Sequence, residues 1–130
     1  MQLLDHVSIT VRDVQQVRPF YAAIMQALGA IVVYERPDAL GFGERNRPDD
    51  DDHTYVSVFE SPSAVADPRR HWSLRAASEH DVRRFYEAGL AAGGTSDGVP
   101  GVRAHYHPGY YAAFVVDPEG NRIEAVYHHA

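Results

Sequence analysis

The sequence predicts an α+β fold made of two copies of one βαβββ module, and three observations support that prediction. The chain resembles itself when it is shifted by 65 residues, which is half its length of 130. Each half contains one segment in which apolar residues recur at helical spacing. Each half also contains short segments in which apolar and polar residues alternate, as they do in strands with one buried face.

The internal repeat has no gap over its best-matched part. The stretch "HVSITVRDVQQVRPFYAAIMQALG" lies over "HWSLRAASEHDVRRFYEAGLAAGG". Identical residues coincide at His6/His71, Ser8/Ser73, Val17/Val82, Arg18/Arg83, Phe20/Phe85, Tyr21/Tyr86, Ala23/Ala88, Ala27/Ala92 and Gly29/Gly94. We therefore expect one domain over residues 1–130, with a first module at 1–60, a linker at 61–70 and a second module at 71–130.

In the first module, "DHVSITV" alternates and predicts a strand whose polar face begins with His6. The helix that follows in "VQQVRPFYAAIMQALG" has Asp13 in the N-cap position and Gly29 as its terminator. Pro19 is expected to weaken the first turns of this helix. Three short strands are then expected at residues 30–35, 39–44 and 54–60.

The second module repeats this order. A strand is expected at 71–77 and a helix from about Glu79 to Ala92, with Ser78 as its N-cap. Further strands are expected at 101–107, 110–117 and 122–128. The segment "DPEGN" between the last two has the residues of a tight turn, so these two strands are expected to pair.

Composition excludes several classes of protein. The net charge of −6 and the scattered basic residues argue against nucleic acid as a partner. No apolar run approaches the length that spans a bilayer and the N-terminus lacks the pattern of a signal peptide, so a cytoplasmic location is expected. Cysteine is absent, which rules out disulfides and thiolate sites. The loop at 44–53 carries four consecutive aspartates without the spacing of a calcium loop, and a solvated acidic hairpin is expected there.

Three of the expected strands carry a potential metal ligand on their less apolar face. His6 leads "HVSIT", His71 leads "HWSLR", and Glu124 lies in "RIEAV". A lone histidine on a strand is more often an ordinary surface or core residue, but these two histidines occupy the same place in their modules. If the modules pack as related halves, two imidazoles and one carboxylate share one concavity. Such a set suits Fe(II), Mn(II), Ni(II) or Zn(II) and leaves positions open for substrate oxygens.

Four segments give the whole chain a resemblance to a known family: "LDHVSITVRD", "FYAAIMQALG", the histidine of "HWSLRA", and "AAFVVDPEGNRIEAV". The chain resembles the vicinal oxygen chelate superfamily, which includes glyoxalase I, extradiol dioxygenases, and bleomycin- and fosfomycin-resistance proteins. The resemblance implies that two βαβββ modules form a cupped, partly open mixed β-sheet barrel around one divalent metal ion. It also implies that His6, His71 and Glu124 are the ligands.

A fourth ligand would come from the last strand of the first module, "HTYVSVFES". Its inward face presents either Tyr55, Ser57 and Phe59 or Val56, Val58 and Glu60. The unbroken offset of 65 residues places Phe59 opposite Glu124, so a four-ligand site is not expected.

A second polar cluster lies in "RAHYHPGYY". Alternation in a strand would place Arg103, His105 and His107 on one side. A functional interpretation makes Arg103 a clamp for a carboxylate or phosphate, and makes His105, His107 or Tyr106 the proton carrier. The candidate substrate-binding residues are Arg103, Tyr55 and Tyr111. The alternative is an exposed strand end before a Pro-Gly turn.

Two function hypotheses follow. The first is a metal-dependent enzyme that chelates adjacent oxygens of a small substrate, with lyase or isomerase chemistry of the glyoxalase type preferred over dioxygenase chemistry. The second is a binding or resistance protein that sequesters a small molecule without reaction. The resemblance implies a homodimer, and the ligands could come from one chain or be shared between two.

Overall fold

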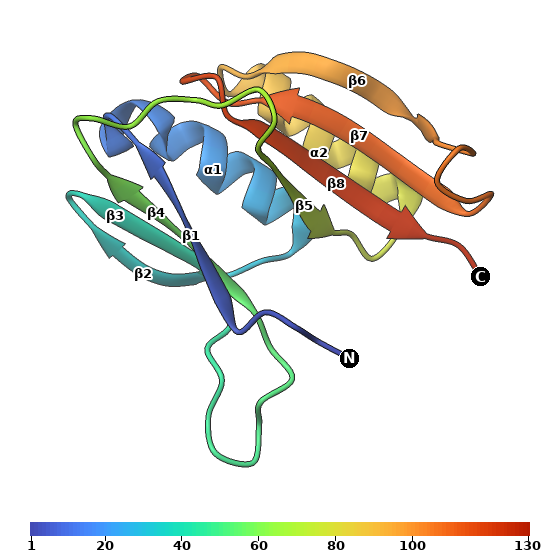
Figure 1. The fold of residues 1–130 in the computed structure, drawn as a ribbon, viewed down its shortest axis with the longest axis horizontal. Helices are drawn as coiled ribbons and strands as arrows, with labels where there is room; N and C mark the ends of the chain where they lie inside the picture. Colours follow the sequence, from blue (N-terminus) through green and yellow to red (C-terminus); the bar gives the residue numbers. More distant parts are fainter.

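The computed structural model describes residues 1–130 and has the α+β fold of two βαβββ modules that the sequence predicts (Figure 1). Each module has one helix and one four-stranded mixed sheet, and the sheets are not closed into a barrel. The first sheet has the order β1-β4-β3-β2 and the second β5-β8-β7-β6. The elements are β1 (His6–Val11), α1 (Val14–Leu28), β2 (Val32–Arg36), β3 (Ala39–Gly43), β4 (Tyr55–Glu60), β5 (His71–Arg75), α2 (Glu79–Ala91), β6 (Thr95–Val102), β7 (Tyr110–Val116) and β8 (Arg122–His128).

Both helices begin and end where the sequence predicts. The side chain of Asp13 accepts a hydrogen bond from the backbone N–H of Gln15, and Gly29 ends α1 in the left-handed conformation with φ of 78°. Ser78 accepts from the backbone N–H of Asp81 at the start of α2. Pro19 lies inside α1 without ending it. Burial of an apolar stripe along α1 therefore outweighs the hydrogen bond that proline removes.

The prediction of a strand at 101–107 is wrong. Strand β6 lies earlier, at Thr95–Val102, and the chain then forms a turn in which the N–H of Tyr106 donates to the carbonyl of Arg103. The strand is hard to recognise because it contains Pro100 and two glycines. It tolerates them because it is the outer strand of its sheet and its pairing with β7 is irregular at these glycines.

Both helices lie on one side of the sheets and pack against each other (Figure 1). One cluster of 20 buried residues runs through both modules. It includes Phe20 and Ile24 of α1, Val58 of β4, Phe85 of α2 and Ile123 of β8. The opposite face of each sheet carries no helix. No helix is both long and apolar enough to cross a membrane.

Strand register corrects the prediction of which residue in the first module is equivalent to Glu124. His6 pairs with Tyr55 in the parallel β1–β4 ladder, while Ser73, two residues beyond His71, pairs with Glu124 in the β5–β8 ladder. The residue equivalent to Glu124 is therefore Ser57, which pairs with Ser8, and Phe59 lies two residues further along β4. The offset between modules grows from 65 residues at the first strands to 67 at the last because the connecting loops differ in length.

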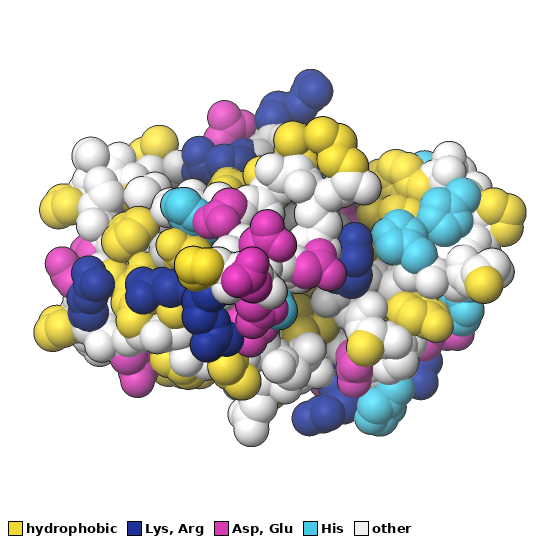
Figure 2. Space-filling model, turned by 90° about the horizontal axis from the view of Figure 1, so that it is seen from below, with side chains coloured by type: hydrophobic (Ala, Val, Ile, Leu, Met, Phe, Trp, Pro, Cys, Tyr) yellow, Lys and Arg dark blue, Asp and Glu magenta, His cyan; other side chains and the backbone are white.

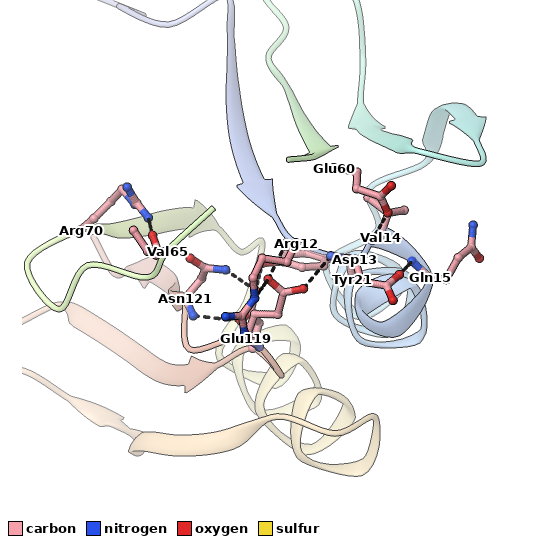
Figure 3. A network of polar contacts seen from close by, with 11 residues as sticks. Arg12, Asp13, Val14, Gln15, Tyr21, Glu60, Val65, Arg70, Glu119 and Asn121 are labelled. Carbon is pink, nitrogen blue, oxygen red and sulfur yellow. Dashed lines mark hydrogen bonds and ion pairs between the residues drawn. The ribbon is translucent and has the colours of Figure 1, made fainter. Parts of the chain in front are cut away.

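A polar network joins the start of α1 to the β7–β8 turn of the other module (Figure 3). The carboxylate of Glu119 accepts from the backbone N–H groups of Arg12 and Asp13 at 2.6 and 2.9 Å. The hydroxyl of Tyr21 donates to the buried carboxylate of Asp117 at 2.5 Å. The "DPEGN" turn forms as predicted, with a hydrogen bond from the N–H of Gly120 to the carbonyl of Asp117.

Candidate functional site

The helix-free face of the second sheet brings His71 and Glu124 together. Because side chains alternate along β8, Ile123 and Ala125 enter the core and Glu124 projects to the opposite face. Nε2 of His71 lies 3.3 Å from Oε1 of Glu124. Glu124 is only 2 % exposed, so its carboxylate depends on partners to offset the cost of leaving water.

Tyr110 is the second partner of Glu124. Its hydroxyl donates to Oε2 of the carboxylate, on the opposite oxygen from His71. Burial, followed by the hydrogen bond to Glu124, raises the pKa of Tyr110 to about 12, while Ser73 acts in the opposite direction. Tyr110 is therefore a protonated donor throughout the physiological range and fixes the orientation of Glu124.

This contact predicts how Tyr110 ionises. In the wild-type protein its pKa is expected near 12, and in Glu124→Gln the pKa should fall part of the way toward the ordinary value of 10.0, because burial still raises it while the neighbouring negative charge is gone. The stability that this contact contributes is complete below pH 10 and is lost as pH rises through 12, since the folded pKa is the higher one. Ultraviolet titration of both proteins, each compared with Tyr110→Phe, isolates this residue. A wild-type Tyr110 that ionises near pH 10 would contradict the contact.

His6 lies at the start of β1 and is not brought to the same place. The side chains of the molecule form no group of three or more histidine and acidic residues close enough to bind one ion. In Figure 1, β1 and β5 run in opposite directions, so their first residues lie at opposite ends of the paired sheets. Nδ1 of His6 lies 2.7 Å from Oδ1 of Asp5. The ring of His6 stacks on that of Tyr55, with the two centroids 4.8 Å apart. The hydrogen bond from His6 also lowers the pKa of Asp5.

The Asp5–His6 pair has a consequence for ligand binding. An ionised Asp5 accepts the proton of Nδ1 and leaves Nε2 of the neutral ring with a free lone pair. A histidine that binds metal is commonly oriented by a carboxylate in this way. Nε2 of His6 is therefore free to accept a ligand bond, but within one chain His6 is not grouped with His71 and Glu124.

The predicted proton carriers lie in the loop between β6 and β7, next to Tyr110. The ring centroid of Tyr106 lies 4.2 Å from that of His105 and 4.7 Å from that of Tyr110. His107 lies close to His128, with Nε2 of the former 2.9 Å from Nδ1 of the latter. Figure 2 shows histidine side chains gathered on the side of the molecule that carries the second sheet. Both ring nitrogens of His107 are engaged, since Nδ1 also accepts from the N–H of Gly109 at 3.0 Å.

The predicted substrate-binding residues are dispersed. Arg103 donates to the carbonyls of Val99 and Gly101, so its guanidinium braces the irregular strand β6. Tyr111 is on the opposite face of β7 from Tyr110, buried in the core, where its hydroxyl accepts from Arg83. Tyr55 lies beside His6. Only Arg103 is on the side of the sheet that carries Glu124, since its guanidinium lies 5.3 Å from the ring centroid of Phe114.

The acidic loop is tied down by its own side chains. Nε2 of His53 lies 2.6 Å from Asp50 and its Nδ1 lies 2.8 Å from Glu44. The hydrogen bond with Asp50 is the main cause that raises the pKa of His53. Asn46 in addition donates to Asp5, the residue that holds His6. The loop thus supports the first module beside His6.

A sequence profile decides the family. The profile of the Glyoxalase/Bleomycin resistance protein/Dioxygenase superfamily matches residues 3–125, nearly the whole chain. The chain belongs to this superfamily. No curated protein matches the chain significantly.

Solved structures of the superfamily share the fold. A glyoxalase/bleomycin resistance protein from Albidiferax ferrireducens T118 is 24% identical, with 98% of this chain and 100% of that chain covered and a TM-score of 0.80. A glyoxalase-related enzyme from Fulvimarina pelagi is 18% identical, with 98% and 89% covered and a TM-score of 0.71. A superfamily enzyme from Burkholderia phytofirmans PsJN is 18% identical, with 96% and 98% covered and a TM-score of 0.69. At these identities the likeness establishes the fold of the superfamily and not a reaction.

Sequence reasoning missed the role of Tyr110. Its Cα lies opposite that of His128 in the β7–β8 ladder, and Phe114 is the residue opposite Glu124. Glu124 lies four residues before His128 on β8, and the tyrosine hydroxyl reaches it because the long side chain leans along its strand on the face that both residues share. Counting outward from the "DPEGN" turn places Tyr110 and Glu124 on one face, and that count was the available signal.

Proposed function

We propose that this protein is a metal-dependent enzyme of the glyoxalase type, a lyase or isomerase that acts on adjacent oxygens of a small molecule. The observation that carries the proposal is the buried Glu124 beside His71, held from its other oxygen by Tyr110. A side chain that only filled this face of the sheet would not need to carry an acid. A protein that only binds apolar molecules has no use for a buried acid and a histidine at this spacing.

The donor atoms fit a divalent ion. The 3.3 Å between Nε2 of His71 and Oε1 of Glu124 is close to the separation of two neighbouring ligand atoms that each lie roughly 2.1 Å from one ion. His6 is the natural third ligand, since Asp5 leaves its Nε2 free. A bound ion would act as a Lewis acid on the substrate oxygens.

His6 would come from a second copy of the chain in this proposal. Within one chain it is not grouped with the other two ligands, whereas a symmetric pair of chains would form two complete sites, each with His6 from one copy and His71 and Glu124 from the other. We therefore propose a homodimer with shared sites. Oxygen ligation by Ser57 is disfavoured, because its hydroxyl is buried and accepts from Tyr34 at 2.7 Å.

The other side chains near Glu124 can each be given a chemical role. Tyr110 holds Glu124 in one orientation and stays protonated, so it does not take part as a base near neutral pH. His105 and Tyr106, next to Tyr110, are the candidates that move protons on the substrate, because the ring nitrogens of His107 are already bonded.

Metal uptake tests the proposal. Protein stripped with a chelator and then supplied in turn with Mn(II), Fe(II), Ni(II) and Zn(II) is expected to retain about one ion per chain by elemental analysis. Glu124→Gln should weaken uptake by at least about 100-fold, because it removes the charged ligand while keeping its volume and its acceptor for Tyr110. Glu79→Gln is the matched control, since Glu79 is an acid on α2 that pairs with His129.

The outcome that overturns the proposal is equally clear. Wild-type protein that retains none of the four ions has no metal site. The hypothesis of a non-catalytic binding protein would then replace that of a metal-dependent enzyme. Uptake that survives in Glu124→Gln would place the ion elsewhere. Circular dichroism of each variant distinguishes loss of the ligand from loss of the fold.

A further inference from the structure

A cavity of about 700 Å³ lies between the two modules. One wall comes from the first module, with Met25 and Leu28 near the end of α1 and with Phe42 and Val56 of its sheet. The opposite wall comes from β5 and β8, and residues 1–4 also line the cavity. This volume is within the range of pockets that bind small organic ligands.

The charge of the cavity is opposite to that of the protein. The chain has 18 acidic residues and a net charge of −6, yet no aspartate or glutamate lines the cavity. Its only ionisable side chains are Arg75 and His128. An anionic ligand therefore meets attraction from the lining of the cavity, in which no carboxylate repels it.

Arg75 has no partner in the protein. It takes part in none of the ion pairs of the molecule, and it is exposed on β5 next to Val126. Its guanidinium thus keeps its full set of donors for a carboxylate or phosphate.

His128 is a hydrogen-bond donor even when it is neutral. The N–H of Gly109 donates to Nδ1 of His107, so the proton of a neutral His107 is on Nε2. That proton is donated to Nδ1 of His128, at 2.9 Å. The proton of a neutral His128 must then be on Nε2, which has no partner in the protein.

We infer that this cavity binds a small amphipathic anion, with its carboxylate or phosphate on Arg75 and His128 and its apolar body against Leu28, Phe42 and Val56. Ser73 lines the cavity and pairs with Glu124 across β5 and β8, so the cavity adjoins the His71–Glu124 pair. As the site for the anionic part of the substrate, this inference rests on the proposed function. As a ligand site of the metal-free protein, the inference does not depend on the proposed function.

Calorimetric titration of metal-free protein tests the cavity with three probes that share one apolar body: phenylbutyrate, phenylbutyramide and phenylbutylamine. The carboxylate is expected to bind, the neutral amide at least about 10-fold more weakly, and the amine not at all. Arg75→Gln should weaken phenylbutyrate binding at least about 10-fold, and Arg75→Lys should restore part of it because the charge returns. Arg69→Gln makes the same change of charge outside the cavity and should leave binding unchanged.

Several results would overturn the inference. Failure of phenylbutyrate to bind, equal binding of acid and amide, or an Arg75→Gln variant that binds like wild type each removes the anion site. Because metal is absent throughout, these results are independent of metal uptake. An anion that binds to protein unable to take up metal supports the cavity and rejects the enzyme.

Discussion

Replacement of Asp117 by alanine is expected to lower the free energy of unfolding by about 3–5 kcal/mol. Asp117 is 3 % exposed, and its carboxylate accepts from the Tyr21 hydroxyl, the side-chain amide of Asn121 and the backbone N–H groups of Glu119 and Asn121. Alanine leaves these donors buried without an acceptor. Urea unfolding followed by circular dichroism measures the change.

Two variants bracket this result. Asp38→Ala removes an exposed aspartate and is expected to change the free energy of unfolding by less than about 0.5 kcal/mol. Tyr21→Phe removes one donor and leaves Asp117 its other three hydrogen bonds, so its effect should fall between the two. Burial, followed by the charge of Asp117, raises the pKa of Tyr21 well above its ordinary value, which keeps this donor in place. A loss below about 1 kcal/mol in Asp117→Ala would mean that the network is not a main support of the fold.

Mixed dimers of two inactive variants are expected to recover metal sites. His6→Ala and Glu124→Gln should each fail to bind an ion when pure. When they are unfolded and refolded together, half of the dimers are mixed and each mixed dimer contains one intact site, so about a quarter of the sites should return. Elemental analysis of the isolated mixed dimer measures the recovery.

The shared arrangement makes this test decisive. If all three ligands belonged to one chain, each chain of a mixed dimer would still lack one ligand, and no site would return. No recovery from a verified mixed dimer therefore places the site within one chain. A protein that sediments as a monomer at micromolar concentration excludes shared sites altogether.

The helices and most strands could be predicted because their signals are local. Asp13, Gly29 and Ser78 mark helix ends by hydrogen bonds to their own neighbours in the sequence. Alternation was also enough to place Glu124 on the face of β8 opposite the core. These features depend on residues a few positions apart, so they can be recognised without knowledge of the tertiary structure.

The missed features depend on distant residues or on loop lengths. Ser57 replaced Phe59 as the counterpart of Glu124 because loops of different length shift the register, and no residue in the strand records that shift. Strand β6 has an apolar pattern that is interrupted by glycine and proline. Arg75 and His128 lie on paired strands of one sheet, but the cavity that they line exists only because the two modules meet beside them, which no local pattern encodes.

The core that runs through both modules also determines how the molecule comes apart. Neither helix packs in a separate interior, and the first residues of α1 are bonded to a carboxylate of the other module. A chain built in this way loses its structure in one all-or-none transition. A fragment with one module would expose the apolar stripe of its helix to water and become prone to aggregation and proteolysis. The repeated sequence therefore encodes a single cooperative unit, in which a substitution that destabilises one module destabilises the other as well.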